Sequence, residues 1–185
     1  MKLLENDRLR LRAPEPEDLD TLYRWENDSS CWESGNTLTP YSRYAIRQYI
    51  ARSGNDFHEH RQLRLMIELR RNAAVAGTID LYDFDPHHLR AGVGILVDQA
   101  FRRQGIAAEA LALTARYAFS FLKIHHLYAH IPQSNIPCLR LFEQCGFETA
   151  GVLKDWMITS EGYANVVVLG MIDSRPARKV MNDER

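Results

Sequence analysis

A strand, a basic turn and a long apolar helix follow one another directly in the middle of this sequence. Residues 93–97 form a short apolar run that predicts a strand. The turn that follows contains Arg102, Arg103 and Gly105, and apolar residues at helical spacing begin at Ile106. The first backbone N–H groups of a helix have no partner within it and lie at the positive end of its dipole. The arrangement therefore predicts a site for phosphate oxygens, to which Gly105 would allow a close approach.

Two common phosphate-binding loops are absent from the sequence. It contains neither G-x-x-x-x-G-K-[ST] nor G-x-G-x-x-G, so a P-loop and a dinucleotide fingerprint are excluded. The turn instead fits the pattern [QR]-x-x-G-x-[GA], through Arg102, Gly105 and Ala107. Taken alone, this pattern is equally compatible with an ordinary glycine turn before a core helix.

Length and composition predict an ordinary globular protein. The chain has 185 residues, of which 45% are apolar and 25% charged. We expect one domain over residues 1–172 and a polar tail over 173–185. A formal net charge of −1 argues against nucleic acid or an anionic membrane as a partner. The sequence has no long apolar run, no signal-peptide pattern at its start and no C-x-x-C, so we expect a cytoplasmic protein.

The histidines raise metal binding as an alternative. His126 and His130 lie in a strand-like run, where a spacing of four residues separates them by about 13 Å. That separation is too large for one ion, so no metal is expected.

Apolar spacing divides the rest of the chain into strands and helices. Strands are predicted at 8–12, 63–69, 75–84, 90–97, 127–131, 152–158 and 163–171, and helices at 16–26, 42–53, 106–123 and 136–145. Gly92 and Gly94 weaken one of these strands just before the basic turn. Glycine within a strand often marks a close approach by a ligand, and we favour that interpretation over a poorly packed strand.

Three segments together resemble the GCN5-related N-acetyltransferase (GNAT) superfamily, over nearly the whole chain. They are residues 97–108, residues 135–147 and the opening Arg8-Leu9-Arg10-Leu11-Arg12-Ala13. The second segment is similar to N-x-x-[AS]-x-x-[LI]-[YF]-x-[KR]-x-G-F. The opening is most similar to the ribosomal-protein N-terminal acetyltransferases and the bacterial spermidine acetyltransferases. The resemblance implies an α/β (α+β) fold with a mixed, mostly antiparallel, twisted sheet of about seven strands and helices on both faces.

The resemblance also implies acetyl-coenzyme A as co-substrate, without a metal. The pantetheine arm would pair with the strand before the basic turn, where that strand splays from its neighbour. The pyrophosphate would lie on the N–H groups that follow, and the segment from residue 135 would flank the thioester. The cofactor-binding residues implied in this way are Ile95, Leu96, Val97, Arg102, Arg103, Gln104, Gly105, Ile106, Ala107, Ala108, Asn135, Cys138 and Phe142.

Two departures from the family pattern affect proton transfer. The related spermidine acetyltransferases have Glu where Gly92 stands, and many members have Tyr where Phe142 stands. A thiolate with a conjugate-acid pKa near 8.5 leaves unprotonated at pH 7 at a cost of about 2 kcal/mol. Deprotonating an alkylamine of pKa ~10.4 costs about 4–5 kcal/mol, whereas an α-amino group near ~7.8 costs about 1 kcal/mol. Losing the Glu therefore matters more, and it matters most for alkylamine acceptors.

Asp83 and Asp80 are the candidates for a base acting through water, with mere solvation as the alternative for both. Tyr82 and Glu33 are the expected acceptor-binding residues. We expect direct acetyl transfer in a ternary complex to a primary amine, either a polypeptide N-terminus or a small polyamine. Assembly into a homo-oligomer stays open. The alternatives are a catalytically silent acyl-coenzyme A-binding module and a metal-dependent hydrolase that uses the histidines.

Overall fold

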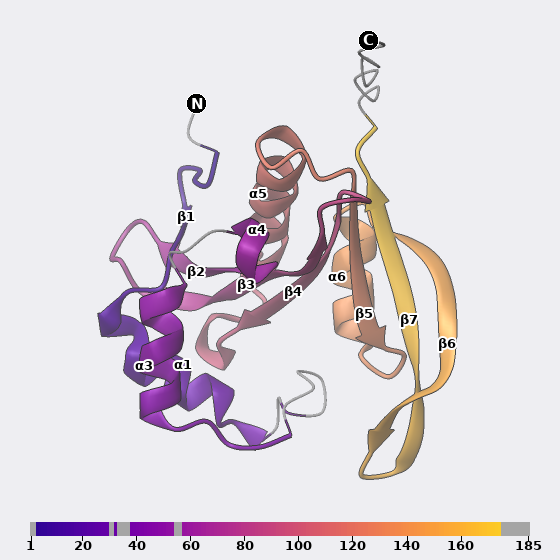
Figure 1. Cartoon of the computed structure of the whole chain (residues 1–185), viewed down its shortest axis with the longest axis horizontal. Coiled ribbons are helices and arrows are strands. Elements are labelled where there is room, and N and C mark those ends of the chain that lie inside the picture. Colours follow the sequence, from indigo (N-terminus) through magenta and orange to yellow (C-terminus); the bar gives the residue numbers. More distant parts are fainter. Residues whose placement is uncertain (1–2, 30–31, 33–37, 54–56, 175–185) are drawn as a thin grey trace.

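Seven strands form one sheet in the computed structural model of the chain, which describes residues 3–29, 32, 38–53 and 57–174. The strands are β1 (Leu9–Arg12), β2 (Leu63–Leu69), β3 (Val75–Asp85), β4 (Arg90–Val97), β5 (His126–Pro132), β6 (Glu148–Thr159) and β7 (Gly162–Ile172). Their order is β1-β2-β3-β4-β5-β7-β6, as Figure 1 shows. Only β4 and β5 run parallel among these neighbours. The predicted mixed, mostly antiparallel sheet is confirmed.

Helices cover both faces of the sheet, as predicted. On one face, α1 (Leu19–Glu26) and α3 (Arg43–Arg52) pack over β2. Their contacts form a small core of Leu22, Trp25, Ile46, Ile50 and Met66. The opposite face carries the larger core, in which α5 (Ile106–Ser120) and α6 (Ile136–Gln144) take part. Because side chains alternate along a strand, Met66 belongs to the first core and Ile67 to the second.

Several local features differ from the sequence-based prediction, among them β6, which begins at Glu148 rather than at residue 152. The short helix α4 (Phe57–His60) was missed, because four residues show no helical period; Phe57 stacks on Phe84 with ring centroids 4.5 Å apart. The helix α5 ends at Ser120 rather than near residue 123. Lys123 has a φ of 60°, and a right-handed helix does not continue through a left-handed residue.

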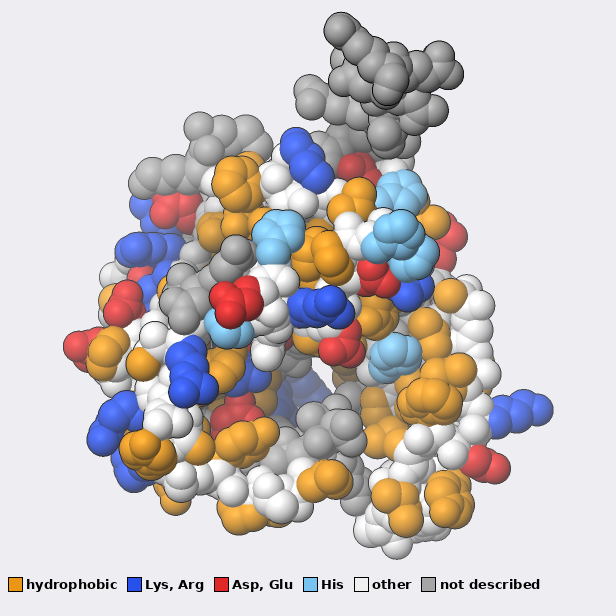
Figure 2. Space-filling model, in the orientation of Figure 1, with side chains coloured by type: hydrophobic (Ala, Val, Ile, Leu, Met, Phe, Trp, Pro, Cys, Tyr) orange, Lys and Arg blue, Asp and Glu red, His pale blue; other side chains and the backbone are white. Residues whose placement is uncertain are grey.

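The parallel strands β4 and β5 pair only at their beginnings and then diverge. The matched residues are Arg90 with His126, Ala91 with Leu127, and Gly92 with Tyr128. The edge of β4 from Val93 onward has no neighbouring strand on that side within the described chain. Figure 1 shows the two strands separating. Figure 2 shows that the surface is hollowed between the part of the molecule that carries β1 to β4 and the part that carries β5 to β7. An unpaired strand edge can pair with an extended ligand.

None of the helices in the described parts of the chain combines the length and the apolar character needed to cross a bilayer.

Candidate functional site

The start of α5 presents unpaired backbone donors at the end of β4. Gly105 precedes the helix with φ 77° and ψ −1°, which is a left-handed conformation. The N–H groups of Ile106, Ala107 and Ala108 donate to no described residue, and the N–H of Glu109 is the first to bond, to Gly105 O at 3.2 Å. The predicted strand, turn and helix start are confirmed. Anion binding at these donors stays a prediction.

The loop before α5, which includes the 3₁₀ turn η3 (Gln99–Phe101), is fixed on one side by Asp98. The side chain of Asp98 accepts from Ala100 N–H at 3.0 Å, from the Trp25 indole at 2.8 Å and from Arg24 at 2.9 Å. Burial raises the pKa of Asp98, but these hydrogen bonds and the charge of Arg24 outweigh it and hold that pKa below its usual range. The loop is thereby tied to α1. This role of Asp98 was not predicted from the sequence.

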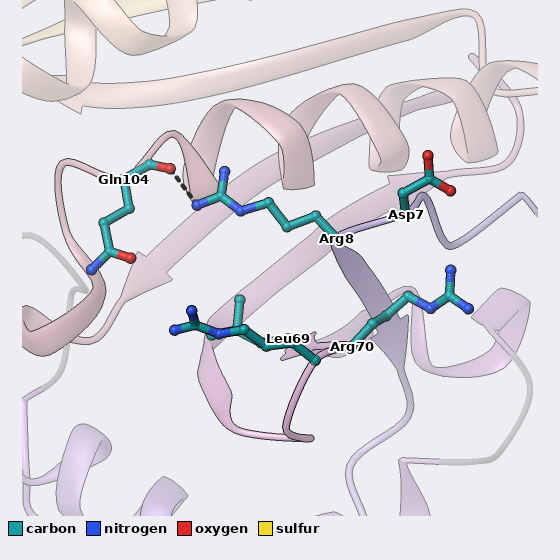
Figure 3. Close-up of a pocket in the computed structure, with 6 residues that line it drawn as sticks. Asp7, Arg8, Leu69, Arg70 and Gln104 are labelled. Carbon is teal, nitrogen blue, oxygen red and sulfur yellow. Dashed lines mark hydrogen bonds between the residues drawn. The ribbon is translucent and has the colours of Figure 1, made fainter.

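On its other side the loop is held by the opening segment of the chain. Arg8 donates to Gln104 O at 2.6 Å and to a Glu109 carboxylate oxygen at 2.6 Å, as Figure 3 shows for Gln104. A pocket of about 470 Å³ lies there, lined by Asp7, Arg8, Leu69, Arg70, Arg71 and Gln104. Two of the three segments that carried the resemblance are therefore in direct contact, and Arg8 restrains the peptide just before Gly105.

The implied cofactor-binding residues lie at the end of β4, in the turn and first residues of α5, and at the start of or within α6. Because β4 and β5 are parallel, the helices that follow them both start where the two strands have separated, which we call the open end of the divergence (Figure 1). Ile95 to Val97 form the free edge of β4, and Arg102 folds back to donate to Val97 O at 3.0 Å. The first turn of α5 meets α6, where Cys145 Sγ lies 4.0 Å from Ala108 O.

Three implied residues lie on or just before α6, and the structure gives each a local role. Asn135 caps the helix, accepting from Cys138 N–H at 3.3 Å. Burial raises the pKa of the Cys138 thiol to about 11. Phe142 is 1% exposed and packs edge-on against Phe147 in the larger core. This burial counts against a direct contact between the Phe142 ring and a ligand.

A second pocket, of about 670 Å³, opens beside Gly92 and Tyr128, the last pair that joins β4 to β5 and therefore the closed end of the divergence. Its lining includes Tyr82, Asp83, Arg90, His126, Tyr128 and His130. Tyr82 was expected at such a site, whereas Arg90 and Tyr128 were missed and the two histidines were considered only as metal ligands. Burial, His125 and Arg90 lower the pKa of His126. Glu33, the other expected acceptor-binding residue, lies outside the described residues.

The space above Gly92 is filled by the protein itself. A Cβ at this position would come within 2.3 Å of the Tyr82 ring, so the strand needs glycine there to seat that ring. The Tyr82 ring gives a reason for this glycine that was not predicted, and a close approach by a ligand stays a prediction. Around Gly94 the nearest atom to an added Cβ is 3.7 Å away, in the same ring.

The two candidate bases have different surroundings. Asp80 is largely buried and accepts from Arg64 Nε at 2.6 Å, while the same guanidinium also bonds to Glu26. Burial raises the pKa of Asp80, and the charge of Arg64 opposes this. Asp83 is exposed and lines the larger pocket. The geometry therefore favours Asp83 over Asp80 for exchange of a proton with a bound molecule.

Among the described residues, no group of three or more His, Cys, Asp or Glu side chains is arranged to hold a metal ion.

Comparison with known families adds the decisive observation. The family described as "Acetyltransferase (GNAT) domain" matches residues 8–148, a span that includes both strands of the divergence, α5 and α6. The chain belongs to the GNAT acetyltransferases. The family predicted from the three sequence segments is thereby confirmed, and the chain is an enzyme of the acyltransferase class.

Relatives of this GNAT chain include polyamine-acetylating enzymes. It is 23% identical over 159 residues to the spermidine N(1)-acetyltransferase of Escherichia coli K12, covering 86% of this chain and 83% of the relative. A crystal structure of spermidine N-acetyltransferase from Vibrio cholerae in complex with CoA and spermine superposes with a TM-score of 0.81, at 23% identity, over 91% of this chain and 98% of that one.

A second branch of the family is also represented among solved structures. A Vibrio cholerae protein proposed to be a ribosomal-protein-serine acetyltransferase matches with a TM-score of 0.72 at 18% identity, over 92% of this chain and 97% of that one. Both branches named from the sequence therefore appear among the similar proteins. At these identities the structural matches establish the fold.

Proposed function

We propose that this GNAT chain transfers acetyl from acetyl-coenzyme A directly to a primary amine within a ternary complex. The observation that carries the proposal is the divergence of β4 and β5, which leads from Gly92 at its closed end to the unpaired N–H groups of α5 at its open end. An extended arm can pair with the free edge of β4, and a pyrophosphate can accept from the helix N-terminus.

In this proposal the donor lies along the opening. The arm follows Ile95, Leu96 and Val97, and the pyrophosphate takes the turn and first helical residues from Arg102 to Ala108. Arg102 and Arg103 add positive charge at the same point. The family membership and the CoA named in the Vibrio cholerae structure support this assignment.

The acceptor amine occupies the larger pocket. Tyr82 and Tyr128 offer aromatic surfaces there, and Asp83 offers a carboxylate that can take up the ammonium proton through a water molecule. A covalent acetyl-enzyme on Cys138 is disfavoured, because burial raises the pKa of that thiol to about 11 and leaves it protonated near neutral pH.

Replacing the carboxylate tests the proposed base. For Asp83→Asn we expect kcat/KM for the amine to fall by about 10²-fold, with the Kd for acetyl-coenzyme A unchanged, because general-base catalysis contributes at least that much. Asp155→Asn is a matched control, since Asp83 and Asp155 are both left-handed, with φ of 49° and 48°. Wild-type kcat/KM in Asp83→Asn would show that another group takes the proton.

The acceptor is tested by coenzyme A thiol release over polyamines, aminoglycosides and N-terminal peptides, each followed against pH. For a polypeptide N-terminus we expect activity to rise with a limb near pH 8, and for a polyamine with a limb near pH 10, because the amine must be neutral to attack. The free-energy cost of deprotonation favours the N-terminus, whereas the named relatives favour a polyamine. Tight binding of acetyl-coenzyme A without thiol release for any amine would support a silent binding module instead.

A further inference from the structure

The ring of Tyr82 occupies the volume of a side chain that position 92 lacks. Tyr82, Gly92 and Tyr128 form one row across β3, β4 and β5. A Cβ built on Gly92 would lie 2.3 Å from Cε2 and 2.4 Å from Cζ of Tyr82. The phenol therefore leans from its own strand over the bare backbone of β4.

This position is the closed end of the divergence. Gly92 and Tyr128 are the last pair that joins β4 to β5. The Tyr82 ring packs edge-on against Tyr128, with centroids 6.1 Å apart, and the main chain of His130 on β5 lies close enough to the phenol to lower its pKa. The hydroxyl thus reaches across to the strand that separates from β4.

The hydroxyl of Tyr82 remains protonated at neutral pH. Burial raises the pKa of Tyr82 to about 12, and the neighbouring Tyr128 and Asp83 act in the same direction. A neutral phenol cannot accept a proton from an amine, but it can donate a hydrogen bond to a developing negative charge.

We propose that Tyr82 is the hydrogen-bond donor to the oxyanion formed during acetyl transfer. This rests on the proposed function, in which an arm lying along β4 brings its thioester to the closed end. The amine nitrogen adds to the thioester carbonyl carbon, and the π electrons move to the carbonyl oxygen, which accepts from Tyr82. The carbon–sulfur bond then breaks as the carbonyl re-forms, the thiolate leaves, and the ammonium proton passes through water to Asp83.

The hydroxyl is better suited to this oxygen than to the departing sulfur. An alkoxide-like oxygen is a much stronger base than a thiolate, whose conjugate acid has a pKa near 8.5. Donors placed in advance at such an oxygen act most strongly where water is excluded. On α6, the Phe142 ring is buried in the core and carries no hydroxyl that would supply this bond.

The test compares wild type with Tyr82→Phe, which keeps the ring and removes the hydroxyl. We expect kcat to fall by about 10²-fold, as for loss of one oxyanion donor, while the Kd for acetyl-coenzyme A changes less than about twofold. In the binary complex, the infrared stretch of a ¹³C-labelled acetyl carbonyl should lie at a higher frequency in Tyr82→Phe than in wild type. A purely structural role would leave that frequency unchanged. Tyr117→Phe, which removes a partly buried phenol on α5, is the matched control.

Gly92→Ala provides an independent second variant. It retains the hydroxyl but displaces the ring, so both the loss of kcat and the shift of the carbonyl frequency should recur. Wild-type kcat and carbonyl frequency in folded Tyr82→Phe would overturn the role of Tyr82 alone. A wild-type chain that neither binds acetyl-coenzyme A nor releases thiol would instead overturn the proposed function.

Discussion

Replacement of Gly105 by Val should weaken binding of acetyl-coenzyme A by about 10²–10³-fold, as measured by isothermal titration calorimetry. Two effects combine. Gly105 has a φ of 77°, where a β-branched residue is strained, and forcing it there costs at least about 1–2 kcal/mol. The side chain would also cover the backbone N–H groups that we assign to the pyrophosphate. The fold itself leaves room, because an added Cβ would meet only Arg8, at 3.7 Å.

Gly162→Val separates ligand binding from backbone strain. Gly162 lies at the start of β7, also with a positive φ, of 116°, and an added Cβ would meet nothing within 4 Å. It should lower the free energy of unfolding by an amount similar to Gly105→Val but leave the Kd for acetyl-coenzyme A unchanged. If Gly105→Val binds acetyl-coenzyme A as tightly as wild type, the proposed placement of the pyrophosphate is wrong.

Replacement of Arg64 by Ala should lower the free energy of unfolding by about 3–5 kcal/mol, because it leaves two carboxylates without their shared partner in a largely buried site. Arg64 bonds Asp80 at 2.6 Å and also pairs with Glu26, and the side chains of Arg64 and Asp80 are only 18% and 16% exposed. The guanidinium also lies over the Tyr49 ring, 5.2 Å from its centroid. Chemical denaturation measures the change.

Arg10→Ala is the control for loss of an arginine as such. Arg10 approaches Glu68 only to 3.9 Å and is 55% exposed, so its removal should cost less than about 1 kcal/mol. Similar losses in the two variants would show that the Arg64 ion pairs contribute no more than a surface pair.

The loss of unfolding free energy in Arg64→Ala should depend on pH. Burial raises the pKa of Asp80, and removing Arg64 removes the attraction that opposes this. Between a pH of about 3.9 and its higher folded-state pKa, the Asp80 carboxyl of the variant is protonated in the folded state but ionised in the unfolded state. This bound proton stabilises the folded state, and the stabilisation is lost as pH rises through the folded-state pKa of Asp80. The variant should therefore be closer to wild type at pH 5 than at pH 8.

Local patterns were sufficient for most of the fold. The spacing of apolar residues predicted β2 over residues 63–69 and α5 from Ile106, because periods of two and 3.6 follow directly from backbone geometry. The divergence of β4 and β5 was expected only through the family resemblance. A strand's own sequence does not reveal how far its neighbour follows it.

In the candidate site, too, some features follow from local sequence and others only from the tertiary structure. The sequence alone predicted the turn that we propose to hold the donor, since the strand, the basic turn with Gly105 and the start of α5 are contiguous, and the start of a helix leaves its first N–H groups unpaired. The surroundings of Asp80, Asp83 and Tyr82 were decided only in the tertiary structure. Arg64 reaches Asp80 from β2, and Gly92 on β4 makes room for Tyr82 from β3. Such long-range contacts depend on strand register and packing, which residue spacing does not encode.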